Sequence, residues 1–281
     1  MTATITEPGL YDMSNAEYHA DPVPGGSLSS SGAKKLIAKT PAHFKWDLDH
    51  PQEHKDVFDF GTAAHSVILE GDESGLEVID APDWRKKDAQ DAKEKAYAAG
   101  KTPLLTKELG KVRDMAAAIR NHPEAMFLLS DGVPEKSGFA QHDTGVWLRA
   151  RFDWLPNKRG RGVIIPDFKT AESADPRKFR KSAADYGYHQ QDPFYRDVAK
   201  LLGLADDPAF VFVVQEKTAP YLVNVIELNE EAVNMGRALN EHAIRTYMTC
   251  KTTGVWPGYQ SGEPISLPKY AEYDADAALA A

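Results

Sequence analysis

The fold is decided by the stretch VWLRARFDWLPNKRGRGVIIPDFKT, residues 146–170. Residues 146–154 and 162–169 carry the alternating and β-branched patterns typical of strands, and the glycine-containing loop PNKRGRG joins them. Residues 134–141 have the same character and are linked to the first of these strands by the turn sequence HDTG. Three consecutive strands of this kind predict a β-meander.

The last of these strands carries polar side chains near its end, on the face that is otherwise apolar. Residues two apart in a strand point to the same face, so Asp167 and Lys169 project together after Ile165. If the two later strands form a hairpin, Asp153 converges with Asp167. Two converging carboxylates raise a proton affinity or recruit a cation, and magnesium prefers oxygen ligands. A surface salt bridge between Asp167 and Lys169 is the alternative explanation of this pattern.

Helices are predicted both before and after the meander in the sequence. The expected helices cover 61–70, 84–100, 106–122 (capped by Thr106), 176–202 (interrupted near 186–188) and 229–251, and two further strands cover 209–217 and 221–228. This order predicts an α/β fold, with a mixed central β-sheet flanked by helices and an N-terminal helical portion. We expect one domain over residues 1–262 and an acidic C-terminal tail over residues 263–281, with residues 1–26 and the end of the chain forming loops.

The helix after the meander carries polar residues on one face. In YGYHQQDPFYRD, Gln191 and Tyr195 are four residues apart and Tyr188 precedes Gln191 by three, so the three side chains form one stripe. Glutamine and tyrosine together are typical of the edge of a ligand site. The alternative is that this helix packs its aromatic face into the core.

Two further candidates for the same site, His65 and Glu135, precede Asp153 in the sequence. His65 lies in FGTAAHSVILE, where Gly61 permits close backbone approach, and a histidine facing two carboxylates can complete a site for manganese. A hydrogen-bonded core histidine is the alternative. Glu135, on the first strand of the meander, is a candidate ligand or supporting carboxylate, and a solvated glutamate at the strand edge is the alternative.

A serine-rich segment precedes the first expected helix. Ser29, Ser30 and Ser31 are followed by Lys34 and Lys35, which makes this helix N-terminus suited to a phosphate, including that of a DNA end. Ordinary capping of the helix by serine explains the same residues.

Composition limits the chemistry that the chain can perform. The single cysteine, Cys250, excludes an internal disulfide, a cysteine-rich zinc site and a cysteine-held iron–sulfur cluster, so the ligands must be oxygen and nitrogen. No apolar run approaches the length needed to cross a membrane and the N-terminus lacks a secretory pattern, so we expect a cytoplasmic protein without membrane association. The net charge of −9 argues against a generally basic surface, but basic residues gather locally on both sides of Asp153, with Arg149 and Arg151 before it, and after Asp167.

Five short motifs occur in an order that resembles a known enzyme group. They are GTAAH (61–65), PEKS (134–137), RARFDWL (149–155), DFKT (167–170) and YGYHQQDPFY (186–195). Together with YDMSNAEYH and TPAHFKW nearer the N-terminus, they resemble the RecE-like exonucleases (exodeoxyribonuclease VIII group) of the PD-(D/E)xK nuclease superfamily. The likeness extends from about residue 11 to residue 195. The chain departs from the usual pattern at Pro166, where an aliphatic residue is more common and where proline predicts a strand edge or bulge.

The resemblance implies roles for individual residues. His65, Asp153 and Asp167 would hold Mg²⁺ or Mn²⁺, with the carbonyl of Phe168 as a further ligand that we expect from the strand end. Catalytic roles fall to Lys169, Asp167, Asp153, Gln191 and Tyr195, and to Glu135 at a position that is often acidic. The resemblance also implies 5′-to-3′ hydrolysis of linear duplex DNA, a ring-like homo-oligomer and a single-strand annealing partner in phage-type recombination.

The predicted reaction is hydrolysis of a DNA phosphodiester by a water molecule that a divalent ion activates. Two alternatives remain open at this point. One is a non-catalytic DNA-binding accessory protein of recombination on a nuclease fold. The other is a sequence-specific endonuclease of the same superfamily.

Overall fold

The hairpin of β5 (Gly132–Gln141) and β6 (Trp147–Pro156) is the longest pair of strands in the fold. The computed structural model describes residues 4–50, 59–260, 262 and 264–280. The two strands pair antiparallel, and β1 (Gly9–Tyr11) pairs antiparallel with the outer edge of β5. On the other side, β2 (Leu28–Ser29) pairs in parallel with β6, giving the order β1-β5-β6-β2. The first two strands of the predicted meander are therefore confirmed.

The third predicted strand belongs to a different sheet. β7 (Ile164–Ala171) pairs in parallel with β8 (Ala209–Glu216), which pairs antiparallel with β9 (Val223–Ile226). The expected hairpin between the strands carrying Asp153 and Asp167 is therefore wrong. Parallel strands buried on both faces form continuous apolar runs, and residues 209–214 of β8 match this better than β6 does. Pro166 lies on the edge strand of this sheet, as the missing backbone donor requires.

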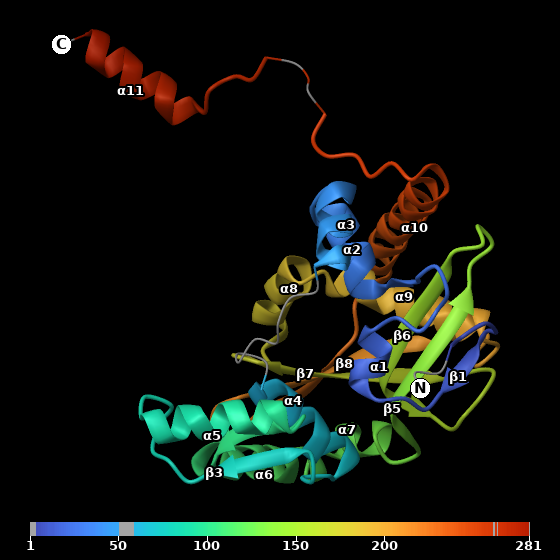
Figure 1. Cartoon of the computed structure of the whole chain (residues 1–281), viewed down its shortest axis with the longest axis vertical. Coiled ribbons are helices and arrows are strands. Elements are labelled where there is room, and N and C mark those ends of the chain that lie inside the picture. The colour runs from blue at the N-terminus through green and yellow to red at the C-terminus, as the bar shows by residue number, and fades with distance from the viewer. Residues whose placement is uncertain (1–3, 51–58, 261, 263, 281) are drawn as a thin grey trace.

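Helices cover both faces of the sheet formed by β7, β8 and β9 (Figure 1). On one face lie α9 (Tyr188–Leu201) and α10 (Glu230–Thr253), with a core that includes Ile165, Phe210 and Phe212. On the other face lie α4 (Asp59–His65) and α6 (Thr106–Arg120), whose side chains pack with Phe168 and Val213. The strand periodicity thus alternates between two cores, which confirms the α/β fold with mixed sheets flanked by helices.

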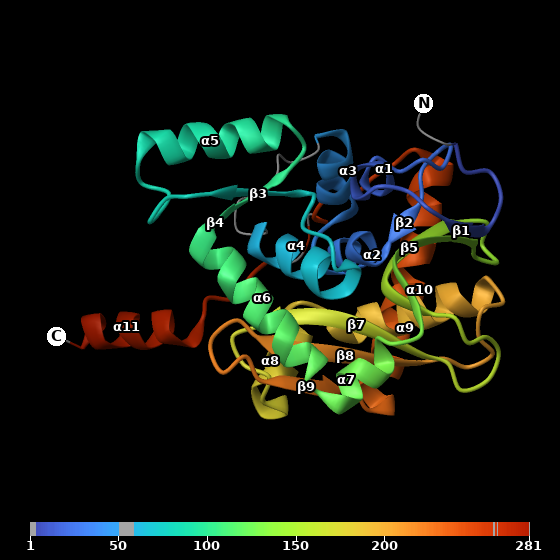
Figure 2. The ribbon, with the colours of Figure 1, turned by 90° about the horizontal axis from the view of Figure 1, so that it is seen from below.

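The remaining elements form three groups. The N-terminal part contains three helices: α1 (Asn15–His19), α2 (Ser30–Ala38) and α3 (Pro41–Asp49). A separate two-stranded parallel sheet consists of β3 (Leu76–Ile79) and β4 (Thr102–Leu105), which α5 (Lys87–Ala98) connects. Two short helices, α7 (Pro123–Leu128) and α8 (Pro176–Asp185), connect other elements. Figure 2 shows α5, β3 and β4 as a layer apart from the main sheets.

Some sequence expectations need correction. The helix predicted over 61–70 changes at His65 from α-helix to a π-helical turn, Ser66–Glu70, which ends at Gly71 with φ of 66°. Leu105, not Thr106, occupies the cap position of α6. Residues 1–26 contain β1 and α1, and β3 and β4 were not expected because each has only four residues.

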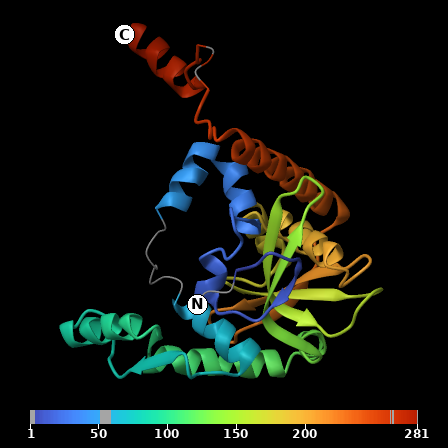
Figure 3. The ribbon, with the colours of Figure 1, turned by 45° about the vertical axis from the view of Figure 1, so that its right-hand side comes forward.

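The acidic end of the chain also contains a helix. α11 (Lys269–Leu279) forms where a loop and tail were expected, and it stands apart from the body (Figure 3). Residues 263 and 281 of the predicted tail lie outside the described residues. No helix in the described part of the chain is long and apolar enough to cross a membrane.

The packing of α10 on α9 depends on a glycine. A Cβ atom at Gly236 would lie 1.5 Å from the carbonyl oxygen of His189, so the two backbones approach too closely for any side chain. Asn240, one turn later, donates from Nδ2 to the carbonyl of Gln190 at 2.7 Å and fixes the same contact.

We expect Gly236→Ala to destabilise the protein by about 3 kcal/mol or more, because overpacking forces the two helices apart. Urea unfolding measures this loss. Gly110→Ala is the matched control, since Gly110 lies within α6 with open space around it. That variant should gain about 0.5–1 kcal/mol from higher helix propensity. Equal effects of the two substitutions would contradict the close approach.

Candidate functional site

The candidate site lies where β6 and β7 diverge into their separate sheets. Asp153, near the end of β6, accepts a hydrogen bond at its Oδ2 atom from the backbone amide of Phe168 at 2.9 Å. This side chain therefore joins two strands that share no ladder. The hydrogen bond also places Asp153 beside Asp167, the neighbour of Phe168 on β7.

Two further potential ligands, His65 and Glu135, gather around Asp153. The Nδ1 atom of His65 lies 3.6 Å from Oε1 of Glu135 and 3.8 Å from Oδ2 of Asp153. One ligand atom from each of the three residues lies within 4.8 Å of the others, a spacing that can hold a metal ion. His65 reaches this position from the last residue of α4, and its ring packs edge-on against Phe168 with centroids 5.3 Å apart.

Glu135 adopts a backbone conformation that is rare for a non-glycine residue. Its φ angle is 52°, although it lies within β5, between Pro134 and Lys136, which pair with Trp154 and Phe152. This register places Glu135 opposite Asp153. Conformations of this kind cost on the order of 1–3 kcal/mol and cluster at functional sites. The Nε atom of Arg151 donates to Oε2 of Glu135 at 2.7 Å and leaves Oε1 facing His65.

Asp167 is held from two other directions. It is 2 % exposed, and Nε2 of Gln191 donates to its Oδ1 atom at 2.7 Å. The ammonium group of Lys169 contacts Oδ2 directly and lies 5.5 Å from the centre of the Tyr188 ring. The predicted projection of Asp167 and Lys169 to one face is confirmed.

The structure separates the predicted residues into two linked groups. His65, Glu135 and Asp153 form the ligand cluster, whereas Asp167 is paired with Lys169 and Gln191 beside it. The amide of Phe168 contacts Asp153, and its side chain is buried in the core shared with α4 and α6.

Tyr195 is partly buried and packs against the core. Its ring packs against Phe152 and Phe210, with centroids 5.4 and 5.6 Å away, and burial raises the pKa of its phenol well above the usual range. The aromatic packing given as the alternative for this helix therefore describes Tyr195, while Gln191 reaches the site.

The charges of the cluster perturb one another strongly. Burial, followed by the nearby charge of Asp167, raises the pKa of Asp153 to about 7. Burial opposes protonation of His65, but Asp153 and Glu135 together outweigh it and raise its pKa. Burial likewise opposes the charge on Lys169, and the carboxylates of Asp167 and Asp153 outweigh it, so its pKa also rises. Such mutual perturbation by buried groups is typical of functional sites.

Arg151 belongs to this network, although the sequence did not indicate its role there. It was expected only to add basic charge near Asp153. The structure instead shows it bonded to Glu135, to the hydroxyl of Ser137 and to the carbonyl of Met13. Arg151 lies two residues before Asp153 and diagonally across the hairpin from Glu135, and this position was the signal in the sequence for their interaction.

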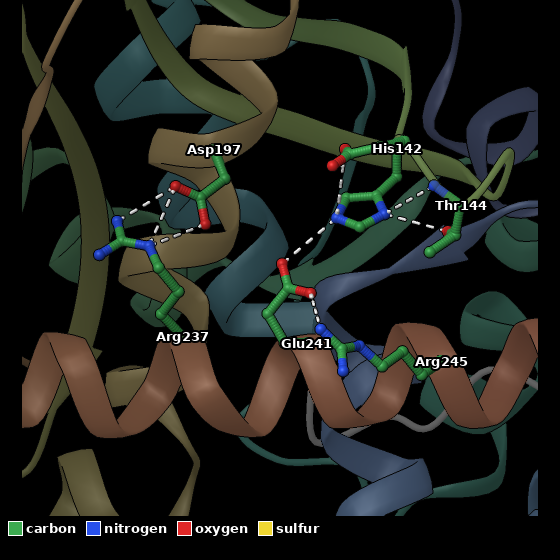
Figure 4. Close-up of polar contacts among 7 residues, drawn as sticks. His142, Thr144, Asp197, Arg237, Glu241 and Arg245 are labelled. Atoms are coloured by element: carbon green, nitrogen blue, oxygen red, sulfur yellow. Dashed lines mark hydrogen bonds and ion pairs between the residues drawn. The ribbon is translucent and has the colours of Figure 1, made fainter.

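A larger cavity, of about 350 Å³, lies between the β5–β6 turn, α9 and α10 and contains none of these residues (Figure 4). Several of its charged residues are paired with one another: His142 contacts Glu241 at 3.2 Å, and Arg237 donates to Asp197 at 3.1 Å. Glu241 also lies 3.9 Å from Arg245. The perturbed carboxylates, and not this cavity, mark the candidate site.

The cluster predicts a specific loss on removal of one ligand. Glu135→Gln keeps the size of the side chain and its contact with Arg151 but removes a charged ligand. We expect the affinity for Mn²⁺ to fall at least about tenfold in isothermal titration calorimetry. Glu70→Gln is the control, because Glu70 is an exposed carboxylate near the cluster but outside it. Unchanged affinity in the Glu135 variant would refute the assignment.

Metal binding should also depend on pH. The proton on Asp153, whose pKa is about 7, competes with a cation below that pH and not above it, and the raised pKa of His65 acts in the same direction. We expect affinity for Mn²⁺ to fall as the pH drops from 8 to 6, by up to about tenfold per unit per proton displaced. Calorimetry in two buffers of different ionisation enthalpy measures the released protons. Equal affinity at pH 6 and pH 8 would contradict this competition.

Comparison with known proteins agrees with the geometry. No curated protein sequence matches the chain. The structure is similar to the crystal structure of a "putative exonuclease" from Eubacterium rectale, with a TM-score of 0.62 and 13% sequence identity over 91% of this chain and 97% of the other. At this identity the likeness shows a shared fold. The family model described as "PDDEXK-like domain of unknown function (DUF3799)" matches residues 29–265. The chain therefore belongs to this family of PD-(D/E)xK nuclease-like domains.

Proposed function

We propose that this protein is a metal-dependent DNA exonuclease. The observation that supports this most directly is the half-buried cluster of His65, Glu135 and Asp153 beside the paired Asp167 and Lys169. A PD-(D/E)xK fold with carboxylates and a lysine converging at the end of a strand is suited to hydrolysis of a phosphodiester.

The donor set fits a hard divalent cation. It offers one imidazole nitrogen and two carboxylate oxygens, with Asp167 as an additional carboxylate next to them, so Mg²⁺ and Mn²⁺ are the proposed ions. When bound, such an ion lowers the pKa of a water molecule and neutralises charge that develops on a phosphate. The close approach of Asp153 and Asp167 is unfavourable without a cation, which the raised pKa of Asp153 reflects.

Lys169 has the position of a catalytic lysine. Its ammonium group is held by Asp167 and has a raised pKa, so it stays charged at neutral pH and can stabilise a negative phosphate oxygen or orient the nucleophile. Gln191 fixes the Asp167 carboxylate from the opposite side and thereby positions this pair. Tyr195 supports the arrangement from the core.

DNA is the proposed substrate because basic side chains are exposed on the helix that follows β7. α8 follows β7 after four residues and buries Phe179 and Ala183 on one face. Its exposed face carries four basic residues: Arg177, Lys178, Arg180 and Lys181. A local basic surface of this kind can contact phosphates although the whole chain is acidic.

A small cavity supports action at a DNA end. It has a volume of about 160 Å³ at the N-terminus of α2, where Ser29 caps the helix by accepting from the amide of Gly32 at 3.1 Å. The capping role expected as an alternative for the serines is therefore present. Arg149, which is only 8 % exposed, also lines the cavity; its Nη1 atom contacts Asp21 and Ser27, and its Nε atom has no hydrogen-bond partner among the described residues. A terminal phosphate fits this combination of helix N-terminus and buried guanidinium.

The finer assignment rests on the motif resemblance to RecE-like exonucleases. It comprises 5′-to-3′ degradation of linear duplex DNA, a homo-oligomer, and cooperation with a single-strand annealing protein in recombination. Each of these three features is part of the proposal, and none of them follows from the nuclease fold itself.

We expect Lys169→Met to lower the rate of Mg²⁺- or Mn²⁺-dependent hydrolysis of end-labelled linear duplex DNA by at least about 10³-fold, because the charge beside the phosphate is lost. Gel analysis of the labelled products measures the rate and gives the polarity. Lys181→Met serves as the control, since it removes one exposed charge of α8 and should lower the rate only severalfold.

A closed circular duplex distinguishes the alternatives in the same assay. An exonuclease spares it, whereas an endonuclease of this fold cuts it. If the wild-type protein binds DNA but hydrolyses neither substrate with either metal, it is a non-catalytic accessory protein. The proposed activity would then be wrong.

A further inference from the structure

We propose that Lys34 is a second phosphate-binding lysine of the site and holds a phosphate of the same DNA strand next to the one that is hydrolysed. This inference rests on the proposed function and adds a residue from a different part of the chain, because Lys34 lies on α2, far in sequence from Lys169 on β7.

Lys34 lies close to Lys169 through a shared aromatic neighbour. The Nζ atoms of both lysines lie within 6.0 Å of the centre of the Tyr188 ring. Asp167 already pairs with Lys169, whereas the repulsion between the two ammonium groups leaves a further anion favourable beside Lys34. The phosphates of a nucleic-acid strand supply regularly spaced anions of this kind.

The ammonium group of Lys34 has unused donors. It donates one hydrogen bond, to the carbonyl of Tyr186 at 3.1 Å, and forms no ion pair with a carboxylate of the described residues. Lysine has three such donors, so two remain for a ligand. Its neighbour Lys35 differs, because it is paired with Asp47 at 2.7 Å.

The surroundings of Lys34 are built to hold its side chain. A Cβ atom at Gly187, which has a φ of 64°, would lie 2.7 Å from Cδ of Lys34. The turn between α8 and α9 therefore leaves space for the lysine stem and supplies the Tyr186 carbonyl that orients its head. Lys34 is only half-exposed, and burial together with the charge of Lys169 lowers its pKa to about 8. A phosphate at this position would compensate the unfavourable charge.

The test measures DNA binding without turnover. Binding of a fluorescently labelled duplex is followed by anisotropy in EDTA at several salt concentrations for the wild type, Lys34→Met, Lys34→Arg and Lys39→Met. Lys39 is the matched control, because it lies exposed at the end of the same helix and its loss changes the net charge equally. Methionine keeps most of the buried stem, and thermal melting verifies that each variant is folded.

We expect Lys34→Met to weaken binding about tenfold and to reduce the slope of log K against log salt by about 0.9, the value for one lost phosphate contact. Lys34→Arg should restore both, and Lys39→Met should resemble the wild type. In steady-state hydrolysis with Mg²⁺, Lys34→Met should raise KM more than it lowers kcat, unlike Lys169→Met.

Two outcomes would overturn the inference in distinguishable ways. If the wild type hydrolyses DNA and folded Lys34→Met binds with an unchanged affinity and salt slope, the assignment of Lys34 is wrong and the proposed function stands. If the wild type neither binds nor hydrolyses DNA, the proposed function and the assignment of Lys34 fail together.

Discussion

The hydrogen bond from the amide of Phe168 to the carboxylate of Asp153 is the constraint on which the site depends. It joins a strand of the antiparallel hairpin to a strand of the parallel sheet at the point where the two separate. A carboxylate in this position is half-buried and lies beside the charge of Asp167, so a proton or a cation stabilises it. The neighbouring elements supply His65 from α4 and Glu135 from the facing strand. The potential to bind a metal therefore follows from the contact between the two sheets at Asp153.

The local pattern of the sequence was sufficient to predict most elements and the grouping of the polar residues. The alternation of Ile165, Asp167 and Lys169 correctly predicted a shared face, because the two-residue period of a strand is a local property. The stripe on α9 similarly predicted that Gln191 reaches the site. Short strands such as β3 and β4 were missed, since four residues contain too few periods to indicate a strand.

Long-range pairing was the part that the sequence could not supply. The order of strands predicted that β6 would pair with β7, whereas each residue of β7 pairs with the residue of β8 that lies 45 positions further along the chain. Choosing between these partners depends on burial of both faces of the sheet, a tertiary property. The same limit applies to the ligand cluster, because Glu135 approaches His65 only once the register of the hairpin and the backbone of Glu135 are fixed.

The positive φ angle of Glu135 sets stability and function against each other at a single position. Glycine would adopt this conformation without steric cost and so relieve on the order of 1 kcal/mol of strain, but it would offer no carboxylate to a cation. Selection for a more stable fold alone would therefore favour loss of the ligand. With glutamate in this conformation, the hairpin is less stable than it could be, and a charge stands at the place where the two sheets separate.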